Sequence, residues 1–269
     1  MPPACFSVCW RDCYTFSDMY NDLFSIGPLT VHGYGLSIGV GTVLALLLAW
    51  HRAEKRGIPS ESVTGLAALV LILGFAGAKL LYILTSIPEF LSDPWGVLGS
   101  EGFVVYGGLL LGLAAALWWC HRKAQDPLLW TDLLLPSVAL AQGFGRIGCF
   151  LAGCCYGLPT ASRLGVVFPV ESAAPAGVPL WPVQLFSSAG DFLLAAVLLL
   201  TEKKAPRRGR TTALYLALYG IGRFLIEFLR NDERGTVGIF STSQFLSFFF
   251  LAGAAAVLLY RKKQKRNGI

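Results

Sequence analysis

Apolar stretches about as long as a bilayer is thick alternate with short polar segments along almost the whole chain. An α-helix needs roughly 20 apolar residues to cross the hydrocarbon core of a membrane, and seven stretches come close to that length. They occupy residues 31–50, 63–86, 103–120, 130–151, 183–200, 211–229 and 240–260. The pattern predicts an all-α integral membrane protein with about seven transmembrane helices over residues 31–260, preceded by an N-terminal arm over residues 1–30.

The composition supports this prediction. Apolar residues make up 55% of the 269 residues, charged residues only 14%, and the mean hydropathy is +0.60. Soluble globular domains carry more charge and fewer apolar residues, so that class is excluded. The N-terminus lacks the basic segment, short apolar core and small-residue cleavage site of a removable signal peptide, so we expect none.

Basic residues gather at alternate ends of the predicted helices. Fifteen Lys and Arg lie in one set of inter-helix segments and four in the alternate set. The first set is 51–62, 121–126, 202–210 and 261–269, and the second is 1–30, 87–102, 152–182 and 230–239. The positive-inside rule therefore predicts that the arm and the 152–182 loop lie outside and the 261–269 tail in the cytoplasm. Topology accounts for the net charge of +6, and we expect no nucleic-acid partner.

Three basic residues, Lys79, Arg146 and Arg223, lie inside predicted helices. An intramembrane charge costs roughly 2.5–3.5 kcal/mol even on the lenient insertion scale, so each is a functional candidate. With the orientation above, all three lie about four to eight residues, or roughly 6–12 Å, from the outer end of their helix. Tyr34 and Tyr106 also lie near outer ends. We therefore expect one polar site in the outer half of the bilayer.

The sixth stretch, YGIGRFLIEFLRND, places three polar side chains on one helical face. Tyr219, Arg223 and Glu227 stand at i, i+4 and i+8, which permits an Arg223–Glu227 ion pair. In the simpler alternative, that pair only ties helices together. Arg146 has no evident acidic partner within its own helix. An arginine at bilayer depth favours an anion, and a phospholipid phosphate is the anion at hand.

Glycines accompany these residues. Gly107 and Gly108 open the third stretch, and Gly153 is among five glycines in or just after the fourth. Small residues let helix backbones approach closely, and they also admit a ligand. Both interpretations stay open, and helix packing without a ligand is the commoner of the two.

Short motifs along the chain resemble those of the bacterial phosphatidylglycerol–prolipoprotein diacylglyceryl transferases. They are YGL (Tyr34–Leu36), GG (Gly107–Gly108), GRIG (Gly145–Gly148), PVQLF (Pro182–Phe186), YGIGRFLIEFLR (Tyr219–Arg230) and SQFLS (Ser243–Ser247). The resemblance implies a seven-helix, multi-pass transferase of the bacterial cell (inner) membrane whose site opens toward the outer leaflet. It implies transfer of the diacylglyceryl group of phosphatidylglycerol to the lipobox cysteine of preprolipoproteins, with release of glycerol phosphate and without cofactor or metal.

The resemblance also assigns roles to individual residues. Those it implies to be catalytic are Tyr106, Tyr219, Arg223 and Glu227. Those it implies to bind phosphatidylglycerol are Tyr34, Gly107, Gly108, Arg146, Gly153, Gln184 and Arg223.

The sequence departs from the usual family pattern where protons are handled. Two asparagines and a glutamate are replaced by Cys149, Ala152 and Cys154, two histidines by Tyr106 and Trp181, and an arginine by Lys79. Losing a general base costs roughly 10²–10⁴-fold in rate, whereas nearby arginines lower the pKa of an acceptor thiol. We expect Tyr106 to orient that thiol. His32 is an alternative base, although a histidine facing interfacial water is the commoner interpretation.

Seven cysteines add a further possibility. Cys5, Cys9 and Cys13 recur at i, i+4 and i+8 in the arm, Cys120 ends the third stretch, and Cys149, Cys154 and Cys155 lie near the expected site. A disulfide between the arm and Cys154 or Cys155 is one expectation, because both lie on the oxidising side. The CxxxCxxxC spacing in the arm is no strong metal signature. Small apolar packing is the favoured interpretation of Cys149 and Cys154, and a metal or redox site is the less common alternative.

Three functions compete on this evidence. The first is the diacylglyceryl transferase with an altered proton-handling set, and the second is an enzyme of the same fold with a different acceptor. The third is a non-enzymatic lipid-binding or thiol-redox membrane protein. Retention of Arg146, Arg223, Tyr219 and Glu227 favours the first two.

Overall fold

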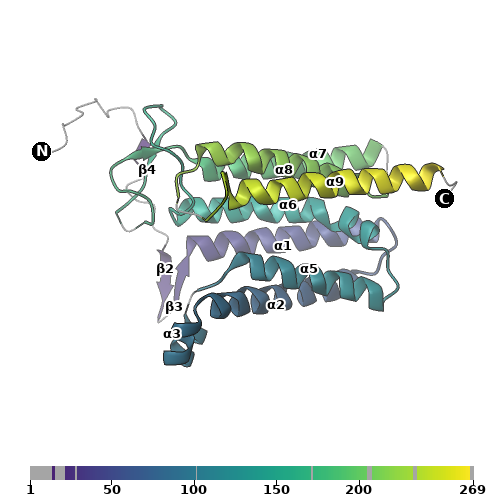
Figure 1. Cartoon of the computed structure of the whole chain (residues 1–269), viewed down its shortest axis with the longest axis horizontal. Helices are drawn as coiled ribbons and strands as arrows, with labels where there is room; N and C mark the ends of the chain where they lie inside the picture. Colours follow the sequence, from purple (N-terminus) through teal and green to yellow (C-terminus); the bar gives the residue numbers. More distant parts are fainter. Residues whose placement is uncertain are drawn as a thin grey trace, which may run out of the picture. The chain divides into compact units, whose positions relative to one another are not determined.

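The computed structural model describes residues 14–15, 22–27, 29–100, 102–170, 172–204, 208–232 and 235–266. Each apolar stretch predicted to be a helix is one (Figure 1). The helices are α1 (Gly33–Glu54), α2 (Ser60–Thr85), α3 (Ile87–Ser92), α4 (Pro94–Gly99), α5 (Val105–Arg122), α6 (Pro127–Leu151), α7 (Val183–Lys204), α8 (Arg210–Ile226), the 3₁₀ turn η1 (Glu227–Leu229) and α9 (Thr242–Arg266). The predicted all-α fold class is confirmed, and the short helices α3 and α4 were not foreseen.

Six helices among the described residues are long and apolar enough to cross a membrane, namely α1, α2, α6, α7, α8 and α9. Large apolar side chains point outward from them, such as Ile72 at 67% exposure and Leu193 at 66%. Surfaces of this kind are stable in lipid and rare on soluble monomers. Helix α5 is not among the six, and its 18 residues end in His121 and Arg122. The count of seven spans and the outside N-terminus therefore stay predictions.

Short strands join the helices. They are β1 (Tyr14–Thr15), β2 (Asp22–Ile26), β3 (Leu29–His32), β4 (Val166–Val167), β5 (Pro179–Leu180), β6 (Thr236–Val237) and β7 (Phe240–Ser241). Within the described part of the arm, β2 and β3 form an antiparallel hairpin that leads into α1. Strand β4 pairs with β1 in parallel and with β5 antiparallel. Cys5, Cys9 and Cys13, and with them the expected disulfide to the arm, lie outside the described residues.

Contacts divide the chain into two units, which we call the first unit (residues 46–134) and the second unit (residues 1–45 with 135–269). In the first unit, α2 and α5 lie side by side (Figure 1). They approach closely because Gly77 and Gly107 face each other, and a methyl group on either would overlap the carbonyl oxygen of the other. Gly108 faces Gly74, and a methyl group on Gly108 would overlap the Gly74 carbonyl oxygen.

In the second unit, α8 packs against both α7 and α9. The buried core between the helices includes Ala139, Leu198 and Tyr215. Helix α6 is tied to α7 where the Ser188 hydroxyl donates to the Gly143 carbonyl at 2.9 Å. Gly143 also leaves room for the ring of Phe192 on α7. These contacts hold α6, α7 and α8 together where they present their charged side chains.

The 152–182 loop has a core of its own. This buried apolar cluster contains Phe150, Val166, Phe168 and Leu180. Backbone hydrogen bonds join the loop to the end of α8, from the Leu158 amide to the Leu229 carbonyl at 2.8 Å and from the Asn231 amide to the Tyr156 carbonyl at 3.2 Å. The loop is therefore attached to the same helix that carries Arg223.

Candidate active site

A pocket of about 370 Å³ in the second unit brings the two intramembrane arginines together. Arg146 reaches it from α6, and Tyr219 and Arg223 reach it from α8. Its walls are mostly apolar and include Leu193 and Leu218, which are also exposed on the surface of their helices. Arg146 and Arg223, which the sequence predicts to face one cavity, both line this pocket. A half-buried pair of guanidinium groups suits an anion with a hydrocarbon tail.

Arg223 is held by two neighbours and keeps one donor group unused. One of its terminal nitrogens donates to the Ser243 hydroxyl on α9 at 2.6 Å. The other, Nη1, lies 3.4 Å from Glu227 Oε2, as the i, i+4 spacing predicted. Among the described residues, buried Nη1 makes no hydrogen bond of good geometry. A buried guanidinium group with an unsatisfied donor is a starting point for binding an anion.

Asp191 is a pocket residue that sequence reasoning missed. It lies on α7, is 8% exposed, and lines the pocket with Arg146 and Arg223. The sequence alone could have indicated Asp191, because a carboxylate inside an apolar helix is as unusual as an arginine there. Arg146 therefore does share its pocket with an acidic residue, contributed by a neighbouring helix rather than by its own.

Tyr219 is fixed by aromatic neighbours. Its ring stacks on Tyr215 with centroids 5.5 Å apart and planes 3° apart, and its other side meets the edge of Phe250 at 5.3 Å. Tyr215 is anchored in turn, since its hydroxyl donates to the Gln142 side-chain oxygen at 2.8 Å. The phenol of Tyr219 thus has a defined position beside the arginines in the pocket wall.

Tyr34 begins α1 and lies against α6. A methyl group at Gly148 would come within 3.1 Å of the Tyr34 carbonyl oxygen and 3.2 Å of its ring. Gly148 follows Arg146 by two residues, so the glycine allows Tyr34 to approach the arginine-bearing turn. The phenol side chain is 42% exposed.

Gln184 and Gly153 shape the backbone after α6. The buried Gln184 amide nitrogen donates to the Cys154 carbonyl at 2.8 Å. Gly153 has φ +65°, a left-handed conformation that favours glycine, and a methyl group there would collide with Ser172. Both residues hold the chain that carries Cys154 and Cys155, and their contact with lipid stays a prediction.

Tyr106, Gly107 and Gly108 belong to the first unit. The glycines have a visible role in packing α5 against α2, and Tyr106 at the start of α5 is 41% exposed. Lys79 is held in this unit by backbone carbonyls, at 2.7 Å from Ser100 and 3.4 Å from Gly102. Catalysis by Tyr106 and lipid binding by the two glycines stay predictions.

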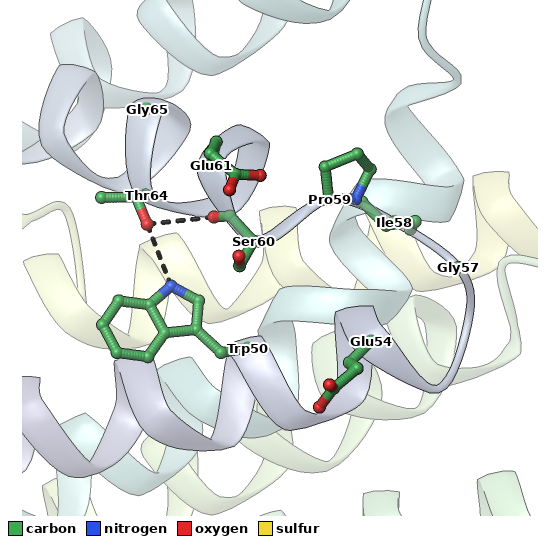
Figure 2. A pocket seen from close by; sticks show the side chains of 9 residues that line it. All are labelled: Trp50, Glu54, Gly57, Ile58, Pro59, Ser60, Glu61, Thr64 and Gly65. Atoms are coloured by element: carbon green, nitrogen blue, oxygen red, sulfur yellow. Dashed lines mark hydrogen bonds between the residues drawn. The ribbon is translucent and has the colours of Figure 1, made fainter.

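A second hollow, of about 940 Å³, lies in the first unit between the end of α1 and the start of α2. Figure 2 shows Trp50 donating to the Thr64 hydroxyl, which in turn donates to the Ser60 carbonyl, each at 3.0 Å. The charged residues of its lining are Glu54 and Glu61. Carboxylates repel a phosphate, so this hollow is not the anion site.

Comparison with known proteins agrees with this architecture. The profile of the family described as prolipoprotein diacylglyceryl transferase matches residues 21–260. A Clostridium perfringens protein named phosphatidylglycerol–prolipoprotein diacylglyceryl transferase 2 is 45% identical over 252 residues, which cover 91% of this chain and 98% of that protein. A Clostridium tetani protein named phosphatidylglycerol–prolipoprotein diacylglyceryl transferase is 46% identical over 84% of this chain and 92% of its own length. With the profile matching most of the chain and both relatives matching nearly end to end, the chain belongs to the prolipoprotein diacylglyceryl transferase family.

Proposed function

We propose that the protein transfers the diacylglyceryl group of phosphatidylglycerol to the lipobox cysteine of preprolipoproteins, in the bacterial inner membrane. In this reaction the acceptor sulfur forms a C–S bond with the glycerol carbon of the diacylglyceryl group. The bond between that carbon and the phosphate oxygen breaks, and its electron pair leaves with glycerol phosphate. The thiol proton is lost, so atoms and charge balance without a redox partner.

The observation that carries the proposal is the joint placement of Arg146 and Arg223 in one membrane-embedded pocket. In the proposed reaction, negative charge grows on the departing phosphate oxygen. Fixed guanidinium donors in a site of low dielectric stabilise such charge more effectively than water does. Nη1 of Arg223, which makes no hydrogen bond of good geometry among the described residues, supplies one such donor, and Glu227 and Ser243 fix the direction of the guanidinium group.

The remaining predicted site residues take supporting roles in this proposal. Tyr219 directs its phenol toward the phosphate, and Tyr34, with Gly153 and Gln184, bounds the headgroup space. Gly107 and Gly108 stay proposed lipid contacts. Tyr106 orients the acceptor thiol through a hydrogen bond of its hydroxyl group rather than deprotonating it.

The test is transfer from phosphatidylglycerol to a lipobox peptide by the full chain in mixed micelles. Arg146→Ala and Arg223→Ala should each lower the rate by about 10²–10³-fold or more, because each removes a donor to the developing charge. Arg146→Lys should recover only part, since an ammonium group is a point charge without the bidentate fork. Arg163→Ala, which removes an exposed loop arginine, is the matched control and should stay active.

Near-normal transfer by Arg146→Ala would overturn the headgroup assignment. Absence of transfer by the wild-type chain, with phosphatidylglycerol still bound, would favour the lipid-binding alternative. Transfer to a non-lipobox acceptor alone would favour the same-fold enzyme with another acceptor.

A further inference from the structure

Three cysteines lie together beside the proposed site. The sulfur atoms of Cys149, Cys154 and Cys155 all lie within 4.8 Å of one another. Each side chain is half-buried, and within the described part of the chain none of the three forms a disulfide. Cys149 belongs to the last turn of α6, while Cys154 and Cys155 follow that helix.

The backbone holds this cluster from several sides. The Cys154 amide donates to the Cys149 carbonyl at 3.1 Å, which folds the chain back over the helix end. Gln184 anchors the Cys154 carbonyl, and the loop bonds to Leu229 and Asn231 follow directly after Cys155. Cys155 itself has φ +58°, a conformation that a non-glycine residue adopts rarely and usually where surrounding contacts impose it. The convergence of the thiols is therefore built into the local fold.

The spacing of the sulfurs is compatible with a metal site. With Zn–S bonds of about 2.3 Å and tetrahedral angles, neighbouring ligand sulfurs lie about 3.8 Å apart. The three sulfurs lie at most 4.8 Å apart, and a small change in side-chain rotamer would bring them to that separation. Thiolates select zinc and other soft ions over magnesium or calcium. Three protein ligands also leave a fourth position open, as in catalytic zinc sites.

Positive charge nearby favours the thiolate form that a metal requires. Arg146 and Arg230 lie within electrostatic range of the Cys155 sulfur, and a nearby guanidinium charge stabilises a thiolate. Arg230 is buried and fixed by a two-pronged contact with Asp232 at 2.7 and 3.0 Å. A complex of three thiolates and Zn²⁺ carries one net negative charge, which these guanidinium groups offset.

We propose that Cys149, Cys154 and Cys155 bind a zinc ion whose open fourth position takes the acceptor thiol and activates it. This inference rests on the proposed transferase function and departs from the expectation of no metal. A thiol that coordinates zinc is deprotonated outright, so this site would activate the acceptor thiol without a general base. The acceptor thiol releases its proton to solvent, and its sulfur forms the C–S bond as the C–O bond to phosphate breaks. The thioether product is a weaker ligand, and water then takes the fourth position.

The first test measures metal without reference to activity. The reduced full chain in detergent should contain about one zinc per chain, and titration of metal-free protein with Cd²⁺ should produce the ultraviolet thiolate-to-cadmium band. Cys154→Ser and Cys155→Ser should lose most of both signals. A Cys5→Ser, Cys9→Ser, Cys13→Ser variant is the control and should keep them. A wild-type chain with no cadmium band when fully reduced would overturn the site, whatever the variants do.

The second test asks whether the metal activates the thiol. Chelated enzyme should lose about 10²-fold or more in transfer near neutral pH and regain it with Zn²⁺. Its residual rate should rise with pH as a free thiol ionises near pKa 8.5, while the zinc-loaded enzyme should show a lower apparent pKa. Undiminished transfer by chelated, reduced enzyme would overturn the activating role and leave the proposed function standing. Normal metal binding without transfer by either the chelated or the zinc-loaded enzyme would contradict the transferase function, and with it the activating role of zinc. The metal site itself would still stand.

Discussion

Charge balance around the pocket depends on individual side chains. Arg146 and Arg223 supply two positive charges, and Asp191 and Glu227 supply two negative ones. Glu227 is committed to Arg223 by the 3.4 Å contact, whereas Asp191 shares the pocket with both arginines. Asp191 therefore occupies the environment that a phosphate would enter, and it opposes the phosphate by like charge.

We accordingly expect Asp191→Asn to tighten binding of the anionic headgroup. The KM for phosphatidylglycerol should fall about 5–10-fold, equivalent to ~1–1.4 kcal/mol, because one repelling charge is gone. Initial rates at several phosphatidylglycerol fractions in mixed micelles measure this. Glu89→Gln, an exposed carboxylate on α3, is the matched control. A rise in KM would mean that Asp191 mainly positions the arginines.

The sequence alone identified Arg146 and Arg223 as candidates, but it could not identify the residues that pack beside them, for a physical reason. A charge in an apolar helix stands out from its own surroundings, and Tyr219, Arg223 and Glu227 align because they share one helix. The meeting of Asp191 with Arg146 depends on how α7 packs against α6, which spacing within a helix does not encode. The cysteine cluster likewise required the turn after α6.

At the scale of the element, close approach of α1 to α6 depends on a glycine that faces the partner. Gly148 contacts Tyr34, whereas Gly145, one turn earlier on the same helix, has nothing within 4 Å of an added methyl group. Gly148 therefore limits the distance between α1 and α6, whereas Gly145, in the same motif, does not.

The pair gives a prediction with its own control. Gly148→Ala should destabilise the protein by about 1–3 kcal/mol, because overpacking displaces Tyr34 from α6, and transfer should fall several-fold. Gly145→Ala should keep activity and gain up to about 1 kcal/mol, since alanine favours helix over glycine. Thermal unfolding in detergent and transfer rates measure both. Equal behaviour of the two variants would contradict a specific role of the Gly148 contact.

Helices could be predicted from the sequence because a bilayer demands long apolar runs, and all seven runs form helices. The strands could not, because pairs as short as β4 and β5 leave no alternating pattern. The core under the 152–182 loop was equally hidden. Phe168 and Leu180 are separated by a segment rich in proline and alanine, and they come together where β4 and β5 pair.

At the scale of the whole molecule, orientation is set by charge outside the helices. The bias of fifteen basic residues against four concerns segments that flank the spans, and it acts during insertion rather than through contacts in the folded chain. The 261–269 tail and the 152–182 loop are predicted to lie on opposite sides of the membrane.

An epitope tag tests this orientation. A tag after Ile269 should resist protease in intact spheroplasts and be digested only after permeabilisation. A tag inserted at Ala161, exposed in the loop, should be digested without permeabilisation and serves as the positive control. Digestion of the tail tag in intact spheroplasts would reverse the predicted topology.

Leu193 and Leu218 line the arginine pocket and are exposed on lipid-facing helices. We therefore expect a donor lipid to enter sideways by diffusion in two dimensions, with its acyl chains remaining in hydrocarbon. For such an enzyme the effective concentration is the mole fraction of donor among neighbouring amphiphiles, not its molarity in bulk water. Added inert detergent slows turnover by surface dilution although the total amount of donor is unchanged, and membrane composition becomes a direct control on the rate of lipoprotein production.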